Sequence, residues 1–505
     1  MRGFLGGPAF ELFMGLIQRR LILQAGAGII LACFAVLLAF FIFRPVLKNA
    51  IEARAVSMLR AQFASDVRFQ KFDVSFFPLV HVVVRGVLIG NDPTRPMMQV
   101  SSADAHCGLL PWHVRTLVLQ GLLVRIPPPA VAMTVTPKPA FTVSIDEIVS
   151  EHAQVAILPS LHFDLAHLRI NNFSASRAAD FSATVVTPEP RADVAASGRL
   201  GPWNVQDPSR TPLQGTYTMA RGDLTTLPGW KGILTSQGRF QGVLRRIEIA
   251  GDANSTQFGL SGGHPEPFNA NFQAAVDASD GSASIEQMNG MLQRSSFVAS
   301  GVVRNIQDDG QRDITLDISV PQGRLEDFVP MAMPSTTSPV SGPLSLKGKI
   351  EILPGEQDVL NRLRLDADFA APDARFSSLD LRERLRSASR KAEGHPKNAA
   401  AGSSIASMQG HVRLDNGVAQ FSDLAFDLEG ASARFTGSYK LASQRLDLHG
   451  EVWMDAKLSQ TATGAKAFFL KAAEPFFGSK RGGSRIPIKV TGTQSDPQFA
   501  LDLAK

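Results

Sequence analysis

The feature that most constrains this chain is a two-residue alternation of apolar and polar side chains that recurs over most of its length. The C-terminal segment IPIKVTGTQSDPQFALDL, residues 486–503, shows it clearly. Apolar residues take alternate positions on both sides of a short turn, and Lys489, Gln498 and Asp502 stand between them. Because successive side chains of a strand point to opposite faces, this period predicts strands with one apolar and one polar face.

Six apolar residues of this segment are candidates for a functional surface, because they share one face of the predicted hairpin. We expect them to point into a groove near its distal end, while Lys489, Gln498 and Asp502 face water. The six lipid-groove candidates are Ile486, Ile488, Val490, Phe499, Leu501 and Leu503.

The same period begins near residue 67 and continues to the end of the chain. Residues 67–76, 80–90 and 116–126 each read as one strand, and the Pro-rich stretch 127–140 reads as a loop. Further strands follow, separated by Gly, Pro, Asn and Asp turns. No helices of 10–15 residues alternate with them, so the pattern favours long antiparallel meanders over a parallel sheet.

One segment breaks the pattern. Residues 21–43, LILQAGAGIILACFAVLLAFFIF, carry no charge. As a helix they would extend roughly 35 Å, enough to cross a bilayer. We interpret them as an uncleaved membrane anchor, with the rest of the chain on one side. Cations flank both ends, Arg19 and Arg20 before and Arg44 after, so charge alone leaves the orientation open.

Helical spacing returns in three places outside the anchor. Residues 46–64 form a basic helix in this interpretation, and residues 377–404 form a basic helix followed by a flexible linker. Residues 463–477 are a third helical pattern, rich in phenylalanine. Their rings either plug the end of the sheet or form a tip that faces a membrane or a partner, and both alternatives stay open.

Composition excludes some functions and leaves others. The chain has 51 Lys+Arg against 46 Asp+Glu, a bias too small and too scattered to indicate nucleic-acid binding. Its 32 Phe against 2 Tyr favour purely apolar contacts, either in a core or on a surface that touches something apolar. Cys33 lies in the long apolar segment 21–43 and Cys107 lies outside it, just before residues 108–112, so we expect no disulfide between them and no metal site.

No catalytic signature emerges. HFDLAH, residues 162–167, has a spacing that resembles metal ligands, but a solvated strand face explains it, since Phe163 and Leu165 alternate with His162 and Asp164. We therefore predict no catalytic residue, no cofactor and no metal. A hydrolase would need a pocket of convergent carboxylates, and nothing in the spacing singles out a pair.

The order of these segments resembles a known family. The anchor, a helix, two strands and LLPWHVRTLVLQGLLVRIPPP, residues 109–129, are similar to the N-terminal region of AsmA-like proteins of Gram-negative envelopes. Residues 272–303, 323–333, 418–441 and 486–503 resemble the AsmA-like C-terminal region. The resemblance covers most of the chain through the order of apolar and glycine patterns, and the basic insert 382–397 matches least.

The resemblance implies a mainly β fold: one N-terminal transmembrane helix, then a long, curved antiparallel sheet with a U-shaped section, an apolar inner groove and a few short helices. It also implies an anchor in the bacterial inner membrane, a cytoplasmic N-terminus, a periplasmic bulk, and transfer of phospholipid or other acyl lipids between inner and outer membrane, without catalytic residues or cofactors. The expected regions are 1–20 (tail), 21–43 (anchor), 44–170 (helix plus β), 171–376 (middle β), 377–404 (linker) and 405–505 (C-terminal β).

Two other functions remain. One is a non-enzymatic envelope scaffold or outer-membrane assembly factor that binds outer-membrane or periplasmic proteins, and the other is the hydrolase. An antiparallel sheet with one apolar face must cover it with a second sheet, with helices or with a ligand, so a sandwich folded on itself competes with a groove for acyl chains. Roughly 25–30 strands side by side would reach at most about 120–145 Å.

Overall fold

The computed structural model describes most of the chain after residue 47. The described residues are 48–57, 59–60, 65–75, 80–92, 94–108, 113–126, 144–157, 161–174, 177–188, 190–204, 207–278, 280–306, 311–333, 338, 340–376, 405–428, 431–454, 484–494 and 496–502. Strands dominate them, so the predicted β class is confirmed. A helix over residues 48–57 and 59–60 agrees with the predicted basic helix.

The strands follow one another along the chain in three groups. The first group is β1 (Val67–Arg68), β2 (Lys71–Ser75), β3 (His81–Ile89), β4 (Met98–Cys107), β5 (His113–Gln120), β6 (Leu123–Ile126), β7 (Ser144–Ile157), β8 (Leu161–Phe173), β9 (Ala179–Pro188) and β10 (Arg191–Leu200). The middle group is β11 (Pro212–Asp223), β12 (Trp230–Lys231), β13 (Ile233–Val243), β14 (Arg246–Leu260), β15 (Glu266–Asp277), β16 (Ser282–Leu292), β17 (Ser295–Ile306), β18 (Gln311–Arg324), β19 (Val340–Ser341), β20 (Pro343–Ile352) and β21 (Leu363–Phe376). The last group is β22 (Ile405–Asp415), β23 (Val418–Leu428), β24 (Ala431–Lys440), β25 (Arg445–Met454), β26 (Ser484–Thr493) and β27 (Pro497–Leu501).

Short helical turns connect some of these strands. They are the 3-10 helices η1 (Pro208–Arg210), η2 (Leu224–Thr226) and η3 (Val329–Ala332), and the α-helices α2 (Leu325–Phe328) and α3 (Val359–Arg362). None of the helices within the described ranges is long and apolar enough to cross a bilayer. The predicted anchor at residues 21–43, the insert 382–397 and the helical pattern 463–477 lie outside the described residues.

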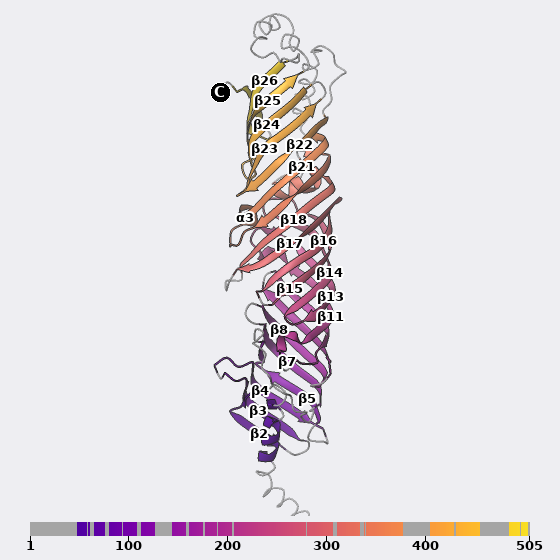
Figure 1. Cartoon of the computed structure of the whole chain (residues 1–505), viewed down its shortest axis with the longest axis vertical. Helices are drawn as coiled ribbons and strands as arrows, with labels where there is room; N and C mark the ends of the chain where they lie inside the picture. The colour runs from indigo at the N-terminus through magenta and orange to yellow at the C-terminus, as the bar shows by residue number, and fades with distance from the viewer. Residues whose placement is uncertain are drawn as a thin grey trace, which may run out of the picture.

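The 27 strands found in the described residues belong to one sheet. Each long strand pairs with its neighbour in the chain, and the short strands β12 and β19 pair with the ends of β14 and β21. Figure 1 shows the result as a long rod in which the strands run obliquely around the long axis, with β2 near one end and β26 near the other. The order of the chain is therefore also the order along the rod.

One pairing departs from the predicted antiparallel meander. β7 runs parallel to β5 and β6, whereas the remaining strand pairs of the described sheet are antiparallel. A parallel neighbour requires the chain to return to the side from which it started. β7 is therefore parallel to the strands before it, and the prediction of a purely antiparallel sheet was wrong at this point.

A line of kinks crosses the first strands of the sheet. Gly86 of β3 and Gly121, between β5 and β6, have φ of 64° and 63°, and His152 of β7 has φ of 53°. A Cβ on Gly121 would lie 2.4 Å from Ser101 Oγ, so glycine is required there for both space and conformation. The segment 116–126, predicted as a single strand, is therefore split into β5 and β6.

The sheet curls back on itself. Ile126 and Ile157, at the ends of β6 and β7, are buried against Leu244 and Ala278, which follow β13 and β15. Several strands separate these residues within the sheet, so only a strongly curved sheet brings them together.

A second such contact lies farther along the rod. The Val359 N–H in α3 donates to the Pro228 carbonyl oxygen over 3.1 Å, and the Ser261 hydroxyl donates to Asp358. At both contacts, one end of the earlier strands meets the opposite end of later strands. Between these two points along the rod, the curved sheet encloses one of its faces.

Candidate functional site

The enclosed face carries an uninterrupted row of cross-strand partners, each directly opposite the next. It starts at Phe72 on β2 and ends at Phe499 on β27. The first row is Phe72, Val84, Ala103, Leu119, Ser150, Leu168, Ala183, Ala196, Tyr217, Gly238, Gly251, Phe272, Met288, Ala299, Ile318, Gly348, Ala367, Val412, Phe421, Gly437, Leu448, Val490 and Phe499. None of its members is charged.

A second row runs beside the first over the same strands. It is Val74, Val82, Ala105, Leu117, Ile148, Ile170, Phe181, Gly198, Gly215, Phe240, Ile249, Ala274, Ile285, Gly301, Leu316, Ile350, Leu365, Leu414, Ala419, Tyr439, Leu446, Gly492 and Pro497. It too contains no charge. We call the face that bears both rows the inner face.

Aromatic rings lie over glycines of the neighbouring strand along these rows. A Cβ on Gly290, beside the first row, would lie 2.3 Å from Phe297 Cζ, and one on Gly215 would lie 2.7 Å from Phe240 Cζ. Gly450 and Phe435 repeat the arrangement on β24 and β25. A ring beside a glycine helps to keep the inner face even, because the bulky side chain fills the space that the small one leaves.

Both tyrosines of the chain lie in the rows, and both phenols are half-buried and hydrogen-bonded. Burial raises the pKa of the Tyr439 phenol to about 12, and its hydroxyl donates to Gln494 Oε1 over 2.7 Å. Burial also raises the pKa of Tyr217, whose hydroxyl lies 3.0 Å from Ser236 Oγ. The remaining hydroxyl of the rows, on Ser150, donates to the Leu119 carbonyl over 2.9 Å. The three side-chain hydroxyls of the two rows are therefore all hydrogen-bonded within the protein.

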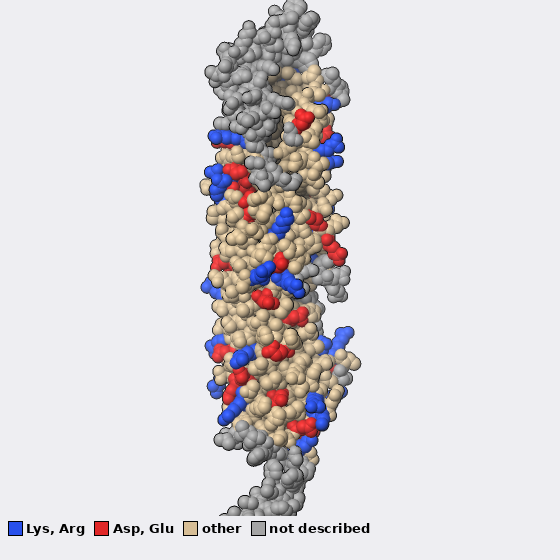
Figure 2. Space-filling model, turned by 180° about the vertical axis from the view of Figure 1, so that it is seen from behind, with Lys and Arg blue, Asp and Glu red and all other residues tan. Residues whose placement is uncertain are grey.

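The opposite face is polar and carries the charges. Arg413 donates to Asp366 between β21 and β22, with 2.9 Å from Nη2 to Oδ2, and Arg485 pairs with Glu451 between β25 and β26. Figure 2 shows Lys and Arg interspersed with Asp and Glu along the outside of the rod, without a broad patch of one sign on that side. Such mixing suits a solvated surface and offers no continuous basic track for a nucleic acid.

Two described helical segments pack on the inner face. Val56 and Leu59, from the first helix, contact the apolar cluster of the first strands around Val87 and Ile89. Leu325 and Phe328 of α2 join a cluster with Phe369 and Met408, which also contact the last apolar cluster, around Leu448 and Val490. The inner face is thus one continuous surface that helices cover only locally within the described part of the chain.

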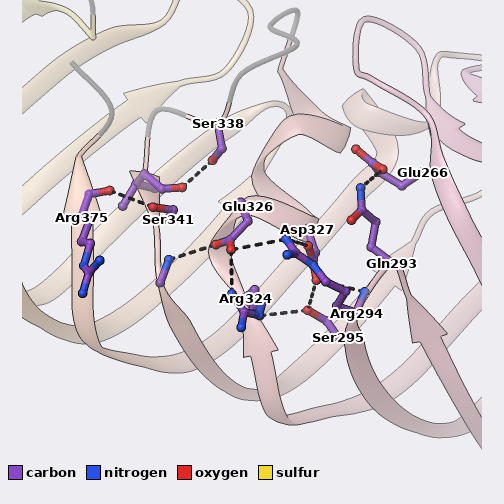
Figure 3. Close-up of polar contacts among 12 residues, drawn as sticks. Glu266, Gln293, Arg294, Ser295, Arg324, Glu326, Asp327, Ser338, Ser341 and Arg375 are labelled. Carbon is purple, nitrogen blue, oxygen red and sulfur yellow. Dashed lines mark hydrogen bonds and ion pairs between the residues drawn. The ribbon is translucent and has the colours of Figure 1, made fainter. Parts of the chain in front are cut away.

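A polar network holds α2 in place on the rim of the sheet (Figure 3). The Asp327 carboxylate is fully buried and accepts hydrogen bonds from Ser295 Oγ at 2.7 Å and from the Arg294 N–H at 3.2 Å. Burial alone would raise the pKa of Glu326, but hydrogen bonds from the Gly342 N–H and from Arg324 hold that pKa below its ordinary value. The network ties β17, β18 and β19 to the segment that reaches onto the inner face.

The C-terminal hairpin places the predicted residues largely on one face. Val490 lies opposite Phe499, and Ile488 lies opposite Leu501. Val490 is 6% exposed and is packed in the last apolar cluster, whereas Phe499 is 53% and Leu501 is 49% exposed on the edge strand β27. Val490 therefore belongs to the floor of the inner face, and the other two form its open end.

Of the remaining groove candidates of the hairpin, Ile486 shares the face of Ile488 and Val490. Ile486 lies opposite Val452, and Leu503 lies outside the described residues. Gln498 is exposed as predicted. Asp502 is only partly accessible, because it accepts a hydrogen bond from His449 Nδ1 at 2.8 Å.

The histidine motif HFDLAH stays a strand face. His162 and Asp164 are exposed, and Phe163 and Leu165 pack into the apolar cluster of the first strands. A different group escaped the sequence analysis because its residues are far apart in the chain. His81 on β3 lies beside Asp104 and His106 on β4, a strand whose polar sequence MQVSSADAHC gave no apolar period.

No protein-family profile, no curated protein and no solved structure matches this chain.

Proposed function

We propose that this protein is a non-enzymatic conduit for acyl lipids, anchored in the bacterial inner membrane by residues 21–43 and extending into the periplasm. In this proposal, phospholipid tails lie along the inner face, headgroups stay at the wet edge, and lipid moves between inner and outer membrane. The AsmA-like resemblance of the sequence is consistent with it. The observation that carries the proposal is the pair of uncharged rows that cross the whole sheet without a break.

Energetics favour acyl chains as the occupant. Each CH₂ moved from water to an apolar surface gains about 0.8 kcal/mol, so a phospholipid tail prefers the inner face to water. Because the rows contain no charge, the floor is uniform along its length and a tail meets no deep trap as it moves. A mixed polar floor would hold chains at fixed points and slow their transfer.

A block in the middle of the sheet tests the proposal. Ile350 lies between Leu316 and Leu365 in the second row. Ile350→Asp places a carboxylate where tails must pass, at a cost of several kcal/mol for an uncompensated charge. We expect the full-length variant, reconstituted in vesicles, to transfer a fluorescent phospholipid to acceptor vesicles at least about tenfold more slowly than the parent.

The matched control lies on the same strand. Ser345 is exposed and points to the opposite face, so Ser345→Asp should transfer lipid at the parental rate. Circular dichroism and thermal midpoints show whether both variants fold. Parental transfer by a folded Ile350→Asp protein would remove the inner face from the lipid path.

The scaffold alternative rests on one observation, the edge strand β27. It pairs with β26 on one side and exposes Phe499 and Leu501. As an edge strand, β27 offers its other side for pairing with a strand of a partner protein. Leu501→Asp would then abolish capture of an outer-membrane or periplasmic partner while leaving lipid binding in the middle of the sheet unchanged. The conduit proposal predicts instead that lipid transfer falls in this variant.

A further inference from the structure

Three metal-ligating side chains meet on the outer face of the first strands. His81 Nε2 lies 2.5 Å from Asp104 Oδ1, and His106 Nε2 lies 3.4 Å from the same oxygen. The two imidazole rings are stacked with centroids 4.6 Å apart and planes inclined by 21°. One nitrogen or oxygen from each residue lies within 4.8 Å of the others, and this is the one such group of three within the described residues.

The fold fixes these residues from the backbone upward. His81 and His106 are direct cross-strand partners of β3 and β4, and Asp104 is two residues before His106, so all three side chains emerge on one face. Val84 and Ala103, on the opposite face, pack into the apolar cluster. The three ligands are therefore carried by strands that the core holds rigidly, while their tips remain accessible to solvent.

We propose that His81, Asp104 and His106 form a binding site for a divalent transition-metal ion, with Zn²⁺ as the best match. Two imidazole nitrogens and one carboxylate oxygen are a ligand set that zinc accepts, whereas calcium and magnesium prefer oxygen alone. A tetrahedral ion with bonds of about 2.0–2.1 Å separates its ligand atoms by about 3.3 Å. The contact between His106 and Asp104 has this spacing already.

A small adjustment brings the contact between His81 and Asp104 to the same spacing. The His81 and Asp104 atoms are at hydrogen-bond distance and must separate by about 0.8 Å, which rotation of partly exposed side chains allows. Three protein ligands leave the fourth position to water or to a group from outside. The ion would cross-link β3 to β4 at the end of the rod that follows the first helix, independently of whether lipid occupies the inner face.

Metal titration of the full-length protein tests the site. The protein is purified without a histidine tag, stripped with a chelator and titrated with ZnCl₂ by calorimetry, with Co²⁺ absorption as a second readout of the ligand geometry. We expect one strong equivalent per chain and a zinc-dependent rise in the thermal midpoint. Mutation of a residue that only hydrogen-bonds to a metal ligand already lowers metal affinity by about 10–100-fold. Loss of a ligand itself, in His81→Asn or His106→Asn, should therefore weaken zinc binding at least about tenfold.

His411→Asn is the matched control. His411 also contacts two carboxylates, Asp366 at 3.2 Å and Asp368 at 2.9 Å, but among the described residues it belongs to no group of three candidate metal ligands. Zinc affinity should be unchanged in this variant. Equal affinity in the parent, His81→Asn and His106→Asn proteins would overturn the site, as would a parent that binds no zinc. The side chains of His81 and His106 are 34% and 57% exposed, so both variants should keep their fold.

Discussion

At the scale of single residues, the inner face depends on pairs in which a ring covers a glycine. Gly290 is buried, and the Phe297 ring of the next strand occupies the place of its missing Cβ. Gly290→Ala forces a collision that the packed face cannot relieve without moving the ring. We expect a loss of about 1–3 kcal/mol, the usual cost of overpacking, seen as a lower thermal midpoint.

The partner residue supplies the control for this pair. In a Phe297→Ala background the ring is gone, so the same alanine at Gly290 should lower the midpoint by clearly less than it does in the parent. Such non-additivity is the signature of two residues in direct contact. Equal losses in both backgrounds would show that the ring does not set the requirement for glycine.

At the scale of elements, the end of the sheet is fastened by a pH-sensitive contact. His449 on β25 donates to Asp502, just after β27, and also lies 3.2 Å from Asp447. The hydrogen bond that His449 donates to Asp502, and then the charges of both carboxylates, raise the pKa of His449. Because that pKa is raised in the folded state, the contact stabilises β27 fully below pH 6.5 and is lost as pH rises through the folded pKa.

Hydrogen exchange measures this effect directly. After correction for intrinsic rates, the amides of β27 should exchange faster above the folded pKa of His449 than at pH 5.5, whereas those of β21 should not change. Asp502→Asn should remove most of the difference. Exchange of β27 that is independent of pH in the parent would show that His449 does not hold the last strand.

The elements also show how far the sequence alone reaches. The two-residue period predicted the strands and the shared face of Val490 and Phe499, because strand geometry follows directly from apolar spacing. β4 was missed because its inward residues Ala103 and Ala105 are small and its outward ones polar, so no apolar alternation marks it.

Other features depend on how strands are placed beside one another. The direction of β7 depends on the course of the chain before it, and the split at Gly121 depends on a neighbour, Ser101, from another strand. The group of His81, Asp104 and His106 arises from the register of β3 and β4. The register between paired strands was not predicted from this single sequence. The complete rows and the group of three ligands are therefore seen only in the folded sheet.

At the scale of the whole molecule, the unbroken rows define the account. With roughly two dozen strands at about 4.8 Å each, they extend on the order of 110 Å measured across the strands. This length is shorter than the upper bound expected from the sequence. The short strands β6, β12 and β19 each pair with the end of a long strand that another strand already pairs with, so they add no width to the sheet. The inner face remains a continuous surface from the first helix to the edge strand.

Position-resolved photocrosslinking tests this account most directly. A benzophenone amino acid is placed at Phe240 or Ile249, partners in the second row, or at Arg239 or Gln241, which point to the outer face. The full-length protein is irradiated in bacterial cells, and its adducts are identified by mass spectrometry. We predict acyl-lipid adducts at Phe240 and Ile249 and none at the two outer positions. Lipid adducts that ignore the alternation, or none at the inner positions, would contradict the claim that the inner face binds acyl chains.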